Sequence, residues 1–214
     1  MQKRLTWIFD LDNTLHDARP HIMPHINRSM TRYVRDQLGV SEEEAARLRQ
    51  VYWRRYGATL TGMVRLHGTD AAHFLQETHR FPQLQRMVVR EGGLRHALKR
   101  IPGTKLIYSN APVRYAEEVL GILGVGNFFQ ALYCIEQTRF LPKPAPQSFR
   151  LMLKTERLVP SRCVLVDDML ENLRAAKRLR MKTVWISRET RAPAWVDIRL
   201  ASVLLLPRVA DQLT

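Results

Sequence analysis

The chain is short of cysteine and has no long apolar run. Cys134 and Cys163 are the two cysteines among its 214 residues. Both fall in apolar stretches, which favours buried reduced thiols over a disulfide framework or a cysteine metal site. No stretch approaches the roughly 20 apolar residues of a membrane span, and the first apolar run is interrupted by acids too early for a signal peptide. We therefore expect a soluble, cytoplasmic protein with no membrane partner.

Acidic residues are also scarce, with 20 Asp and Glu against 34 Lys and Arg and a formal net charge of +14. This charge is compatible with a nucleic-acid binder, an anionic substrate or an arginine-rich surface. Because the arginines are spread along the chain, the pattern favours solvated helical surfaces. Apolar residues make up 45% of the chain, so we expect one folded domain, or one domain with a smaller insertion.

Five short apolar runs without polar alternation predict the strands of a parallel sheet that is covered on both faces. They span residues 5–9, 105–108, 131–135, 163–166 and 183–186. A helical or turn-rich segment follows each run, so the predicted fold class is α/β, with a doubly wound, Rossmann-like parallel-sheet core. A sixth run, residues 203–206, is a candidate edge strand before Pro207.

Residues 17–90 contain no convincing strand, and they predict an all-helical cap inserted into this core. The catalytic core then comprises residues 1–16 and 91–214. The cap would follow the first group of acidic residues described below.

The clearest cap helix should begin at Ser41, which forms a capping box with Glu44, and end near Gly57, a residue suited to the left-handed position after a helix. Its apolar positions recur at helical spacing and predict a core-facing stripe rather than a cofactor site. These positions are Ala45, Leu48, Tyr52 and Tyr56. Two more cap helices are expected over residues 20–37 and 70–77.

Two acids stand one residue apart where the first predicted strand ends. Asp10 and Asp12 are followed by Asn13 and Thr14, which permit a tight turn. One carboxylate placed there can attack phosphorus, while the second protonates the leaving oxygen and then activates water. The alternative is a strand followed by a turn with solvated acids.

Polar residues also follow the second and third predicted strands. Ser109 and Asn110 precede a helical pattern, where a hydroxyl and a backbone amide bind an anion well, although a plain helix cap explains them equally. Lys143 lies between Pro142 and Pro144, which restrict its backbone. Such a lysine can neutralise a phosphate and an attacking carboxylate together; the alternative is a solvated loop lysine.

The fourth predicted strand ends in a pair of acids, Asp167 and Asp168, followed by a predicted helix over residues 169–180. Adjacent carboxylates repel each other unless a cation lies with them, and hard oxygen ligands of this kind suit Mg²⁺. Helix capping by Asp168 is an alternative that leaves Asp167 unexplained. Asn172 could steady the pair without touching the metal.

In this order, the D-x-D-N-T motif at residues 10–14, Ser109, Lys143 and the pair at residues 167–168 resemble the haloacid dehalogenase-like superfamily of phosphohydrolases, as does the position of the helical cap. The resemblance implies that Asp10 is the nucleophile and Asp12 the general acid and base. It also implies that Ser109 and Asn110 hold the phosphoryl group, and that Lys143 pairs with that group and with Asp10.

The same resemblance implies an Mg²⁺ cofactor. Its direct ligands would be the carboxylates of Asp10 and Asp168 and the backbone carbonyl of Asp12. Asp167 would act through a water molecule, and Asn172 would support the acids without touching the metal. Reaction would proceed through an aspartyl phosphate. An acid at the position of Asp12 favours a phosphatase, because dehalogenases of the superfamily lack one.

The motifs D-L-D-N-T-L and V-D-D-x-x-x-N-L, together with residues 56–62, resemble the pyrimidine 5′-nucleotidase branch, although His16 stands where many of its members have tyrosine. We therefore expect a phosphatase for a small phosphorylated metabolite, in particular a pyrimidine nucleoside 5′-monophosphate. Candidate cap contacts are Tyr56, Thr59 and His67, for each of which ordinary packing or solvation is the favoured role.

Two other functions stay open. A phosphoglycolate or phosphosugar phosphatase would share the catalytic core and differ in the cap. A non-catalytic nucleic-acid-binding protein is the less favoured alternative, prompted by the mixture of aromatic residues and arginines at residues 51–56. The sequence leaves open whether the chain is a monomer or a homodimer.

Overall fold

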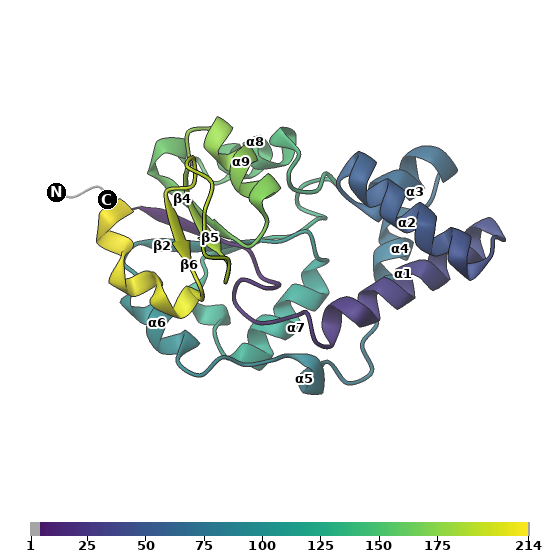
Figure 1. Cartoon of the computed structure of the whole chain (residues 1–214), viewed down its shortest axis with the longest axis horizontal. Helices are drawn as coiled ribbons and strands as arrows, with labels where there is room; N and C mark the ends of the chain where they lie inside the picture. Colours follow the sequence, from purple (N-terminus) through teal and green to yellow (C-terminus); the bar gives the residue numbers. More distant parts are fainter. Residues whose placement is uncertain (1–4, 214) are drawn as a thin grey trace.

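The computed structural model describes residues 5–213, which contain one six-stranded sheet with helices on both faces (Figure 1). The order of the strands is β3-β2-β1-β4-β5-β6, and every neighbouring pair is parallel. The strands are β1 (Thr6–Phe9), β2 (Thr104–Tyr108), β3 (Ala131–Tyr133), β4 (Cys163–Asp167), β5 (Lys182–Ile186) and β6 (Ile198–Leu200). This order confirms the predicted doubly wound α/β fold. Because the strand order reverses beside β1, its carboxyl end lies at the position where such sheets gather their ligands.

The predicted edge strand at residues 203–206 is wrong. These residues belong to a 3₁₀ helix, η3 (Val203–Arg208), and the sixth strand is β6, directly before it. The Oγ of Ser202 accepts a hydrogen bond from the backbone N–H of Leu204, which starts the helix, while Val203 and Leu206 are buried. The apolar run therefore serves helical packing rather than strand pairing.

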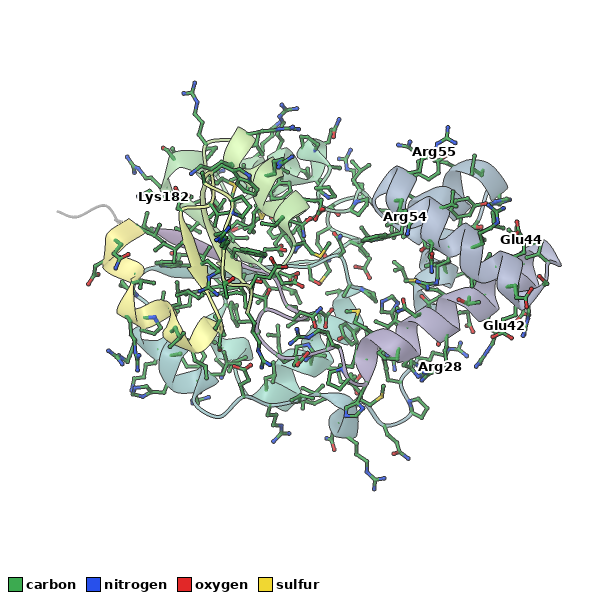
Figure 2. All side chains as sticks on the ribbon, in the orientation of Figure 1. Arg28, Glu42, Glu44, Arg54, Arg55 and Lys182 are labelled. Carbon is green, nitrogen blue, oxygen red and sulfur yellow. The ribbon has the colours of Figure 1, made fainter. Side chains whose placement is uncertain are left out.

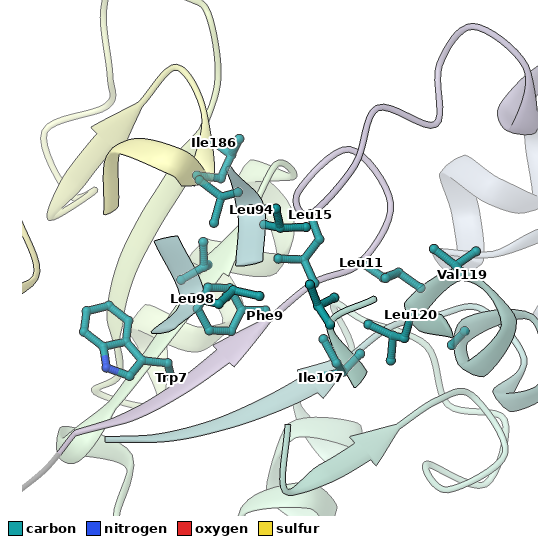
Figure 3. Packing of buried hydrophobic residues seen from close by; sticks show 14 of the residues in the cluster. Trp7, Phe9, Leu11, Leu15, Leu94, Leu98, Ile107, Val119, Leu120 and Ile186 are labelled. Atoms are coloured by element: carbon teal, nitrogen blue, oxygen red, sulfur yellow. The ribbon is translucent and has the colours of Figure 1, made fainter. Parts of the chain in front are cut away.

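One face of the sheet is covered by α6 (Leu94–Arg100) and α7 (Val113–Leu123), which lie below the sheet in Figure 1. Trp7 and Phe9 point into this side, and Figure 3 shows Phe9 next to Leu98. Burial of one such aromatic side chain contributes about 1.5–3 kcal/mol.

The opposite face is covered by α8 (Pro146–Thr155) and α9 (Leu170–Arg178). Ile8 and Leu165 point to this side, in alternation with the residues of the other face. Both faces of the central strands are therefore apolar, which explains their near-continuous hydrophobicity in the sequence.

Four helices extend away from one end of the sheet: α1 (Ile22–Leu38), α2 (Glu42–Tyr56), α3 (Thr59–His67) and α4 (Ala71–Thr78) (Figure 1). The predicted start and end of α2 are confirmed, because the Oγ of Ser41 accepts a hydrogen bond from the N–H of Glu44 and Gly57 has a left-handed φ of 82°. The sequence analysis did not predict α3.

These helices share their own apolar cluster. It contains Tyr33, Val34, Ala45, Tyr52, Leu60, Met63, Phe74, Leu75 and, from the loop after β3, Ile135. The first turns of α1 pack instead with the sheet core, through Ile22 and Ile26, and so do Leu84 and Val88 after the last of these helices. Division of the chain at residues 17 and 90 stays a prediction, and we call the unit formed by α1 to α4 the helical cap.

The remaining helices are short. They are α5 (Leu84–Met87), η1 (Gly126–Phe128), η2 (Pro160–Arg162) and η4 (Ala210–Leu213). Within residues 5–213, none of the helices combines the length and the apolar character needed to cross a membrane. The cytoplasmic location stays a prediction.

Charged side chains cover the outside of the cap, where Figure 2 labels Arg28, Arg54 and Arg55 together with Glu42 and Glu44. The three arginines are exposed. This placement agrees with solvated helical faces as one source of the positive charge.

Candidate active site

The acidic motifs meet where β1 and β4 end. In the register of these strands Phe9 lies opposite Val166, and the backbone N–H of Asp10 donates to the carbonyl of Val166 at 2.9 Å. The chain then turns at Asn13, which has a left-handed φ of 64° and accepts a hydrogen bond from the N–H of Ala18 on its Oδ1. The turn follows Asp12 directly and leads the chain from the end of β1 toward α1.

Lys143 joins the two acidic motifs. Its Nζ donates to Oδ1 of Asp10 at 2.8 Å, to Oδ2 of Asp167 at 2.8 Å and to the carbonyl oxygen of Tyr108 at 2.7 Å. The lysine is 2% exposed. Since an ammonium group has three donors, every donor of Lys143 is used, and its charge is fixed beside the predicted nucleophile.

Asn110 holds the lysine loop in place. Its Oδ1 accepts from the backbone N–H of Lys143 at 2.7 Å, and its Nδ2 donates to the carbonyl of the same residue at 3.0 Å. The side chain of Asn110 is therefore engaged with the lysine loop, a positioning role that the sequence analysis missed. Because Nδ2 carries a second N–H, these contacts leave the expected phosphoryl contact of Asn110 a prediction.

Ser109 is buried at the end of β2, where its N–H donates to the carbonyl of Tyr133 at 2.8 Å. Its Oγ accepts from the N–H of Ala111 at 3.1 Å. Because the Oγ acts as acceptor in this contact, its own O–H can be donated to an anion. Ser109 thus lies at the same sheet edge as Asp10, in keeping with the phosphate-binding role expected for it.

The two acids of the second pair have different surroundings. Asp167 is fully buried and accepts from Nζ of Lys143, from the N–H of Met169 at 2.8 Å, and from Nδ2 of Asn172 at 3.0 and 3.1 Å on its two oxygens. Asp168 is only partly buried, and its backbone carbonyl accepts from Nε1 of Trp185 at 2.9 Å. Asn172 contacts Asp167 as expected of a supporting residue.

Carboxyl oxygens of Asp10, Asp167 and Asp168 all lie within 4.8 Å of one another. Burial, together with the charges of the other two acids, raises the pKa of Asp168 to about 8. Burial and the charge of Asp167 likewise raise the pKa of Asp10 to about 7, although the ammonium of Lys143 opposes this shift. One lysine does not balance the three carboxyl groups.

A divalent cation fits this cluster. Its donors are hard oxygens, the type that Mg²⁺ prefers, and a cation beside them would favour the ionised carboxylates that burial disfavours. The oxygens of Asp167 already accept from the lysine, an asparagine and a backbone N–H. Asp10 and Asp168 are therefore the residues that would hold the cation directly, and Asp167 would act at one remove.

Lys143 responds to the same surroundings in the opposite direction. Burial alone would lower its pKa, but the carboxylates of Asp10 and Asp167 raise the pKa above its ordinary value. The ammonium is therefore favoured in its charged form. The site combines this cation with acids whose ionisation a second cation would favour.

Asp12 lies outside the acidic cluster and is held separately. Its Oδ1 accepts from the hydroxyl of Tyr115 at 2.5 Å and contacts Nε2 of His16 at 2.9 Å. Tyr115 comes from α7 and was not predicted, because no local pattern connects residues that are 103 positions apart. His16, four residues after Asp12, was noticed only as a departure from the family pattern.

A family model described as haloacid dehalogenase-like hydrolase matches residues 6–180, most of the chain. The chain belongs to this family. The match covers all the motifs from Asp10 to Asp168, and it includes the helical cap.

Phosphate metabolism protein 8 of Saccharomyces cerevisiae is 26% identical to this haloacid dehalogenase-like hydrolase over 196 residues. The aligned part is 83% of the present chain but 60% of the yeast protein, so the chain spans well under two thirds of the length of that relative.

Two solved structures of the same architecture show the fold. A HAD phosphatase from Thermococcus onnurineus superposes with a TM-score of 0.67 at 19% identity, covering 96% of this chain and 97% of the other. L-2-haloacid dehalogenase from Xanthobacter autotrophicus, with chloropropionic acid covalently bound, gives 0.63 at 16% identity, covering 99% and 100%. Likeness to a phosphatase and a dehalogenase alike leaves the reaction to be argued from the residues.

The three candidate cap contacts of this hydrolase are occupied within the cap. Thr59 is buried and its Oγ1 donates to the carbonyl of Arg49 at 3.2 Å, while His67 contacts the hydroxyl of Tyr52 at 2.7 Å. Tyr56 is partly buried, with the guanidinium groups of Arg55 and Arg65 at 5.5 and 5.6 Å from its ring centre. These contacts agree with the packing roles that the sequence analysis favoured.

The cap does approach the site at Gly57. A β-carbon added there would lie 3.6 Å from Cδ of Pro144 and 3.9 Å from the carbonyl oxygen of Lys143. The end of α2 therefore lies against the loop that carries Lys143. This contact brings the helical cap next to the predicted phosphate site.

Proposed function

We propose that this hydrolase is an Mg²⁺-dependent phosphomonoesterase that acts through an aspartyl phosphate on Asp10. The observation that carries the proposal is the placement of Lys143, which bridges Asp10 and Asp167 by two charged hydrogen bonds while Asp168 stands beside them. The lysine and a bound cation would together face the oxygens of a transferring phosphoryl group, as phosphoryl transfer requires.

In the first step Asp10 attacks phosphorus and the bond between phosphorus and the leaving oxygen breaks. Lys143 already occupies Oδ1 of Asp10, so we assign the attack to Oδ2. Asp12 delivers its proton to the leaving oxygen, and the alcohol departs. Ser109 and the backbone after it hold the phosphoryl oxygens.

In the second step Asp12 takes a proton from a water molecule, which attacks phosphorus and releases phosphate from Asp10. Asp12 thereby regains the proton that it gave away. When bound, Mg²⁺ supplies positive charge opposite the phosphoryl oxygens and keeps the acids ionised. The cap would exclude other water and select the leaving group.

Asp12 supports a phosphatase over a dehalogenase. A halide leaves without a proton, whereas an alkoxide leaves far more easily when an acid protonates it. Asp12 is such an acid, and two hydrogen-bond partners hold it. Of the two reactions, only the cleavage of a phosphate ester uses an acid there. The name of the yeast relative also refers to phosphate metabolism.

For the substrate we propose a small phosphorylated metabolite, and specifically a pyrimidine nucleoside 5′-monophosphate. The support is the match of residues 10–15 and 166–173 to the nucleotidase branch, strengthened by Asn172, whose contact with Asp167 gives that segment a structural role. We keep the cytoplasmic location as part of this proposal.

The test is phosphate release, with Mg²⁺, from UMP, CMP, dUMP, dTMP, AMP, GMP, phosphoglycolate and sugar phosphates, with chloride release from 2-chloropropionate measured in parallel. Asp10→Asn is the blank, and Asp36→Asn, which changes an exposed cap acid, is its matched control. We expect turnover of the pyrimidine nucleotides and a loss on the order of 10⁴-fold in Asp10→Asn alone.

Preference for phosphoglycolate or sugar phosphates would retain the catalytic proposal and replace the substrate. Chloride release without phosphate release would contradict the proposal, and so would phosphatase activity that survives in Asp10→Asn.

A further inference from the structure

Asp12 meets both of its partners on one oxygen. The hydroxyl of Tyr115 donates to Oδ1 at 2.5 Å, and Nε2 of His16 lies 2.9 Å from the same atom. Both partners follow Asp12 in the sequence: His16 lies four residues on, in the turn after β1, and Tyr115 lies 103 residues on, in α7. Both contacts fall on Oδ1, so Oδ2 is the oxygen of the carboxyl group that is left for chemistry.

We propose that Tyr115 and His16 are positioning residues that anchor Oδ1 of Asp12, so that Oδ2 exchanges the proton with the leaving oxygen and then with water. This inference rests on the proposed phosphatase reaction. It assigns a function to two side chains that the reaction steps above do not use. Without them the carboxyl group could rotate, and its proton would be shared between two oxygens.

Tyr115 is suited to act as a fixed donor. It is 2% exposed, and burial, reinforced by the charge of Asp12, raises its pKa well above the ordinary value. The phenol therefore keeps its proton and donates it to Oδ1. A short O–H···O⁻ bond of this kind is among the stronger hydrogen bonds in proteins.

The ring of Tyr115 is itself held by aromatic neighbours. Phe81 lies 5.2 Å away between ring centres, and His79 lies 5.9 Å away in an edge-on arrangement. Burial lowers the pKa of His79 to about 4, so this neighbour is uncharged. Both residues belong to the segment that leaves the helical cap, which therefore buttresses the ring that holds Asp12.

His16 is anchored by the same contact. The residue is 2% exposed, and its Nδ1 is buried without a hydrogen-bond partner among residues 5–213. Nε2, the other ring nitrogen, therefore makes the polar contact that orients the imidazole. Because Oδ1 of Asp12 can accept a hydrogen bond whether or not Oδ2 carries a proton, we assign the proton of the ring to Nε2.

The test compares two esters that differ in their need for an acid. An alkyl phosphate requires protonation of its leaving oxygen. 4-Nitrophenyl phosphate instead releases 4-nitrophenolate, which leaves readily as an anion. The constant kcat/KM covers the steps up to the irreversible departure of the alcohol. It therefore reports on protonation of the leaving group and does not depend on the later hydrolysis of the aspartyl phosphate. In Tyr115→Phe we expect kcat/KM to fall on the order of tenfold more for the alkyl ester than for the nitrophenyl ester.

Tyr133→Phe is the matched control, because the hydroxyl of Tyr133 also donates to a carboxylate, Oε1 of Glu156, at 2.8 Å. It should leave the ratio of the two esters unchanged. His16→Leu should shift the ratio of the two esters in the same direction as Tyr115→Phe. In His16→Gln, whose amide N–H can reach Oδ1, the ratio should return most of the way to its wild-type value. Equal losses on both esters in Tyr115→Phe would show a merely structural role and overturn the proposal.

A second measurement does not depend on turnover. A strong hydrogen bond between Tyr115 and Asp12 should give a downfield, slowly exchanging proton resonance in the NMR spectrum of the full chain. The resonance should vanish in Tyr115→Phe and Asp12→Asn and persist in Tyr133→Phe. If the wild type hydrolyses neither these esters nor any phosphate of the substrate panel, the phosphatase proposal fails, and this resonance alone decides how Asp12 is held. Absence of the resonance in the wild type, or its survival in Tyr115→Phe, would overturn the inference.

Discussion

The carboxyl edge of the sheet and the helical cap use buried side chains in opposite ways. At the sheet edge, Asp10, Asp167 and Lys143 are buried with their charges. In the cap, the buried cluster of α1 to α4 is largely apolar, and the charged side chains labelled on it in Figure 2 lie on the outside. Burial of charge is costly, and functional sites are where it is often retained. The comparison therefore supports the proposed chemistry at the sheet edge and the proposed role of the cap in shaping access to it.

The largest expected effect on stability comes from breaking the charge network. Lys143→Met would leave Asp10 and Asp167 buried without their cation, which typically costs about 3–5 kcal/mol of unfolding free energy. Lys154→Met, an exposed change on α8, should cost less than about 0.5 kcal/mol. Urea unfolding of both variants checks this. A small effect in Lys143→Met would mean that charge at the sheet edge is not tightly held.

Metal binding sharpens the comparison through its dependence on pH. Without a metal, the raised pKa values of about 7 for Asp10 and about 8 for Asp168 mean that the folded state binds more protons than the unfolded state. The contribution of these groups to stability therefore falls as pH rises through that range. Mg²⁺ should oppose this loss, because it binds the deprotonated acids.

We expect Mg²⁺ to raise the Tm more at about pH 8.5 than at about pH 6. Where its concentration is 100 times Kd, the free energy of unfolding should increase by about 2.7 kcal/mol. Differential scanning fluorimetry with and without Mg²⁺ measures the effect. Asp168→Asn should abolish it, and Asp197→Asn, which changes an acid paired with Lys177, should retain it. The same gain at both pH values, or in Asp168→Asn, would count against this cation site.

Packing between α2 and α3 tests the cap by itself. A β-carbon added at Gly62 would lie 2.3–2.7 Å from atoms of Tyr52, whereas one added at Gly121 meets nothing within 4 Å. Gly62→Ala should therefore destabilise the protein by about 1–3 kcal/mol, and Gly121→Ala, in α7, should stabilise it by about 0.5–1 kcal/mol. Thermal unfolding distinguishes the two signs. Equal effects would remove the close approach of these two helices from the account.

The smallest effect is expected at the predicted cap contact Tyr56. Because its ring packs beside Arg55 and Arg65, Tyr56→Phe should change kcat/KM on the best substrate by less than about twofold. Steady-state kinetics on that substrate provide the measurement. A loss of tenfold or more would place a substrate contact on the cap where we expect only packing.

Several parts of the site were predictable because parallel strands carry local patterns to a common edge. Asp10 directly follows the buried apolar strand β1, and Asp167 is the last residue of the buried strand β4. Their proximity therefore followed from the predicted sheet. Tyr115 and the pairing of Asn110 with Lys143 were not predictable, because these contacts join residues 103 and 33 positions apart. No periodic pattern encodes contacts of this kind.

The missed helix α3 and the wrong edge strand have local explanations. Helix α3 begins after Ala58, which makes no side-chain cap, and contains Gly62, an unfavourable helix residue that Tyr52 requires to be small. The run at residues 203–206 has the composition of a strand, but Ser202 starts a 3₁₀ helix there. Tertiary packing against Tyr52 outweighs the propensity of the residues in α3, and the cap formed by Ser202 outweighs it at residues 203–206.

The most direct test of the central claim is to trap the phosphorylated protein. We would quench wild type and Asp12→Asn with acid during turnover of the best phosphomonoester and locate any phosphoryl group by mass spectrometry of the peptides. The account predicts one phosphoryl group on Asp10. With 4-nitrophenyl phosphate, whose leaving group needs no acid, this group should be more abundant in Asp12→Asn because water is no longer activated. Active turnover with no phosphoryl group in either protein, or with the group on another residue, would contradict it.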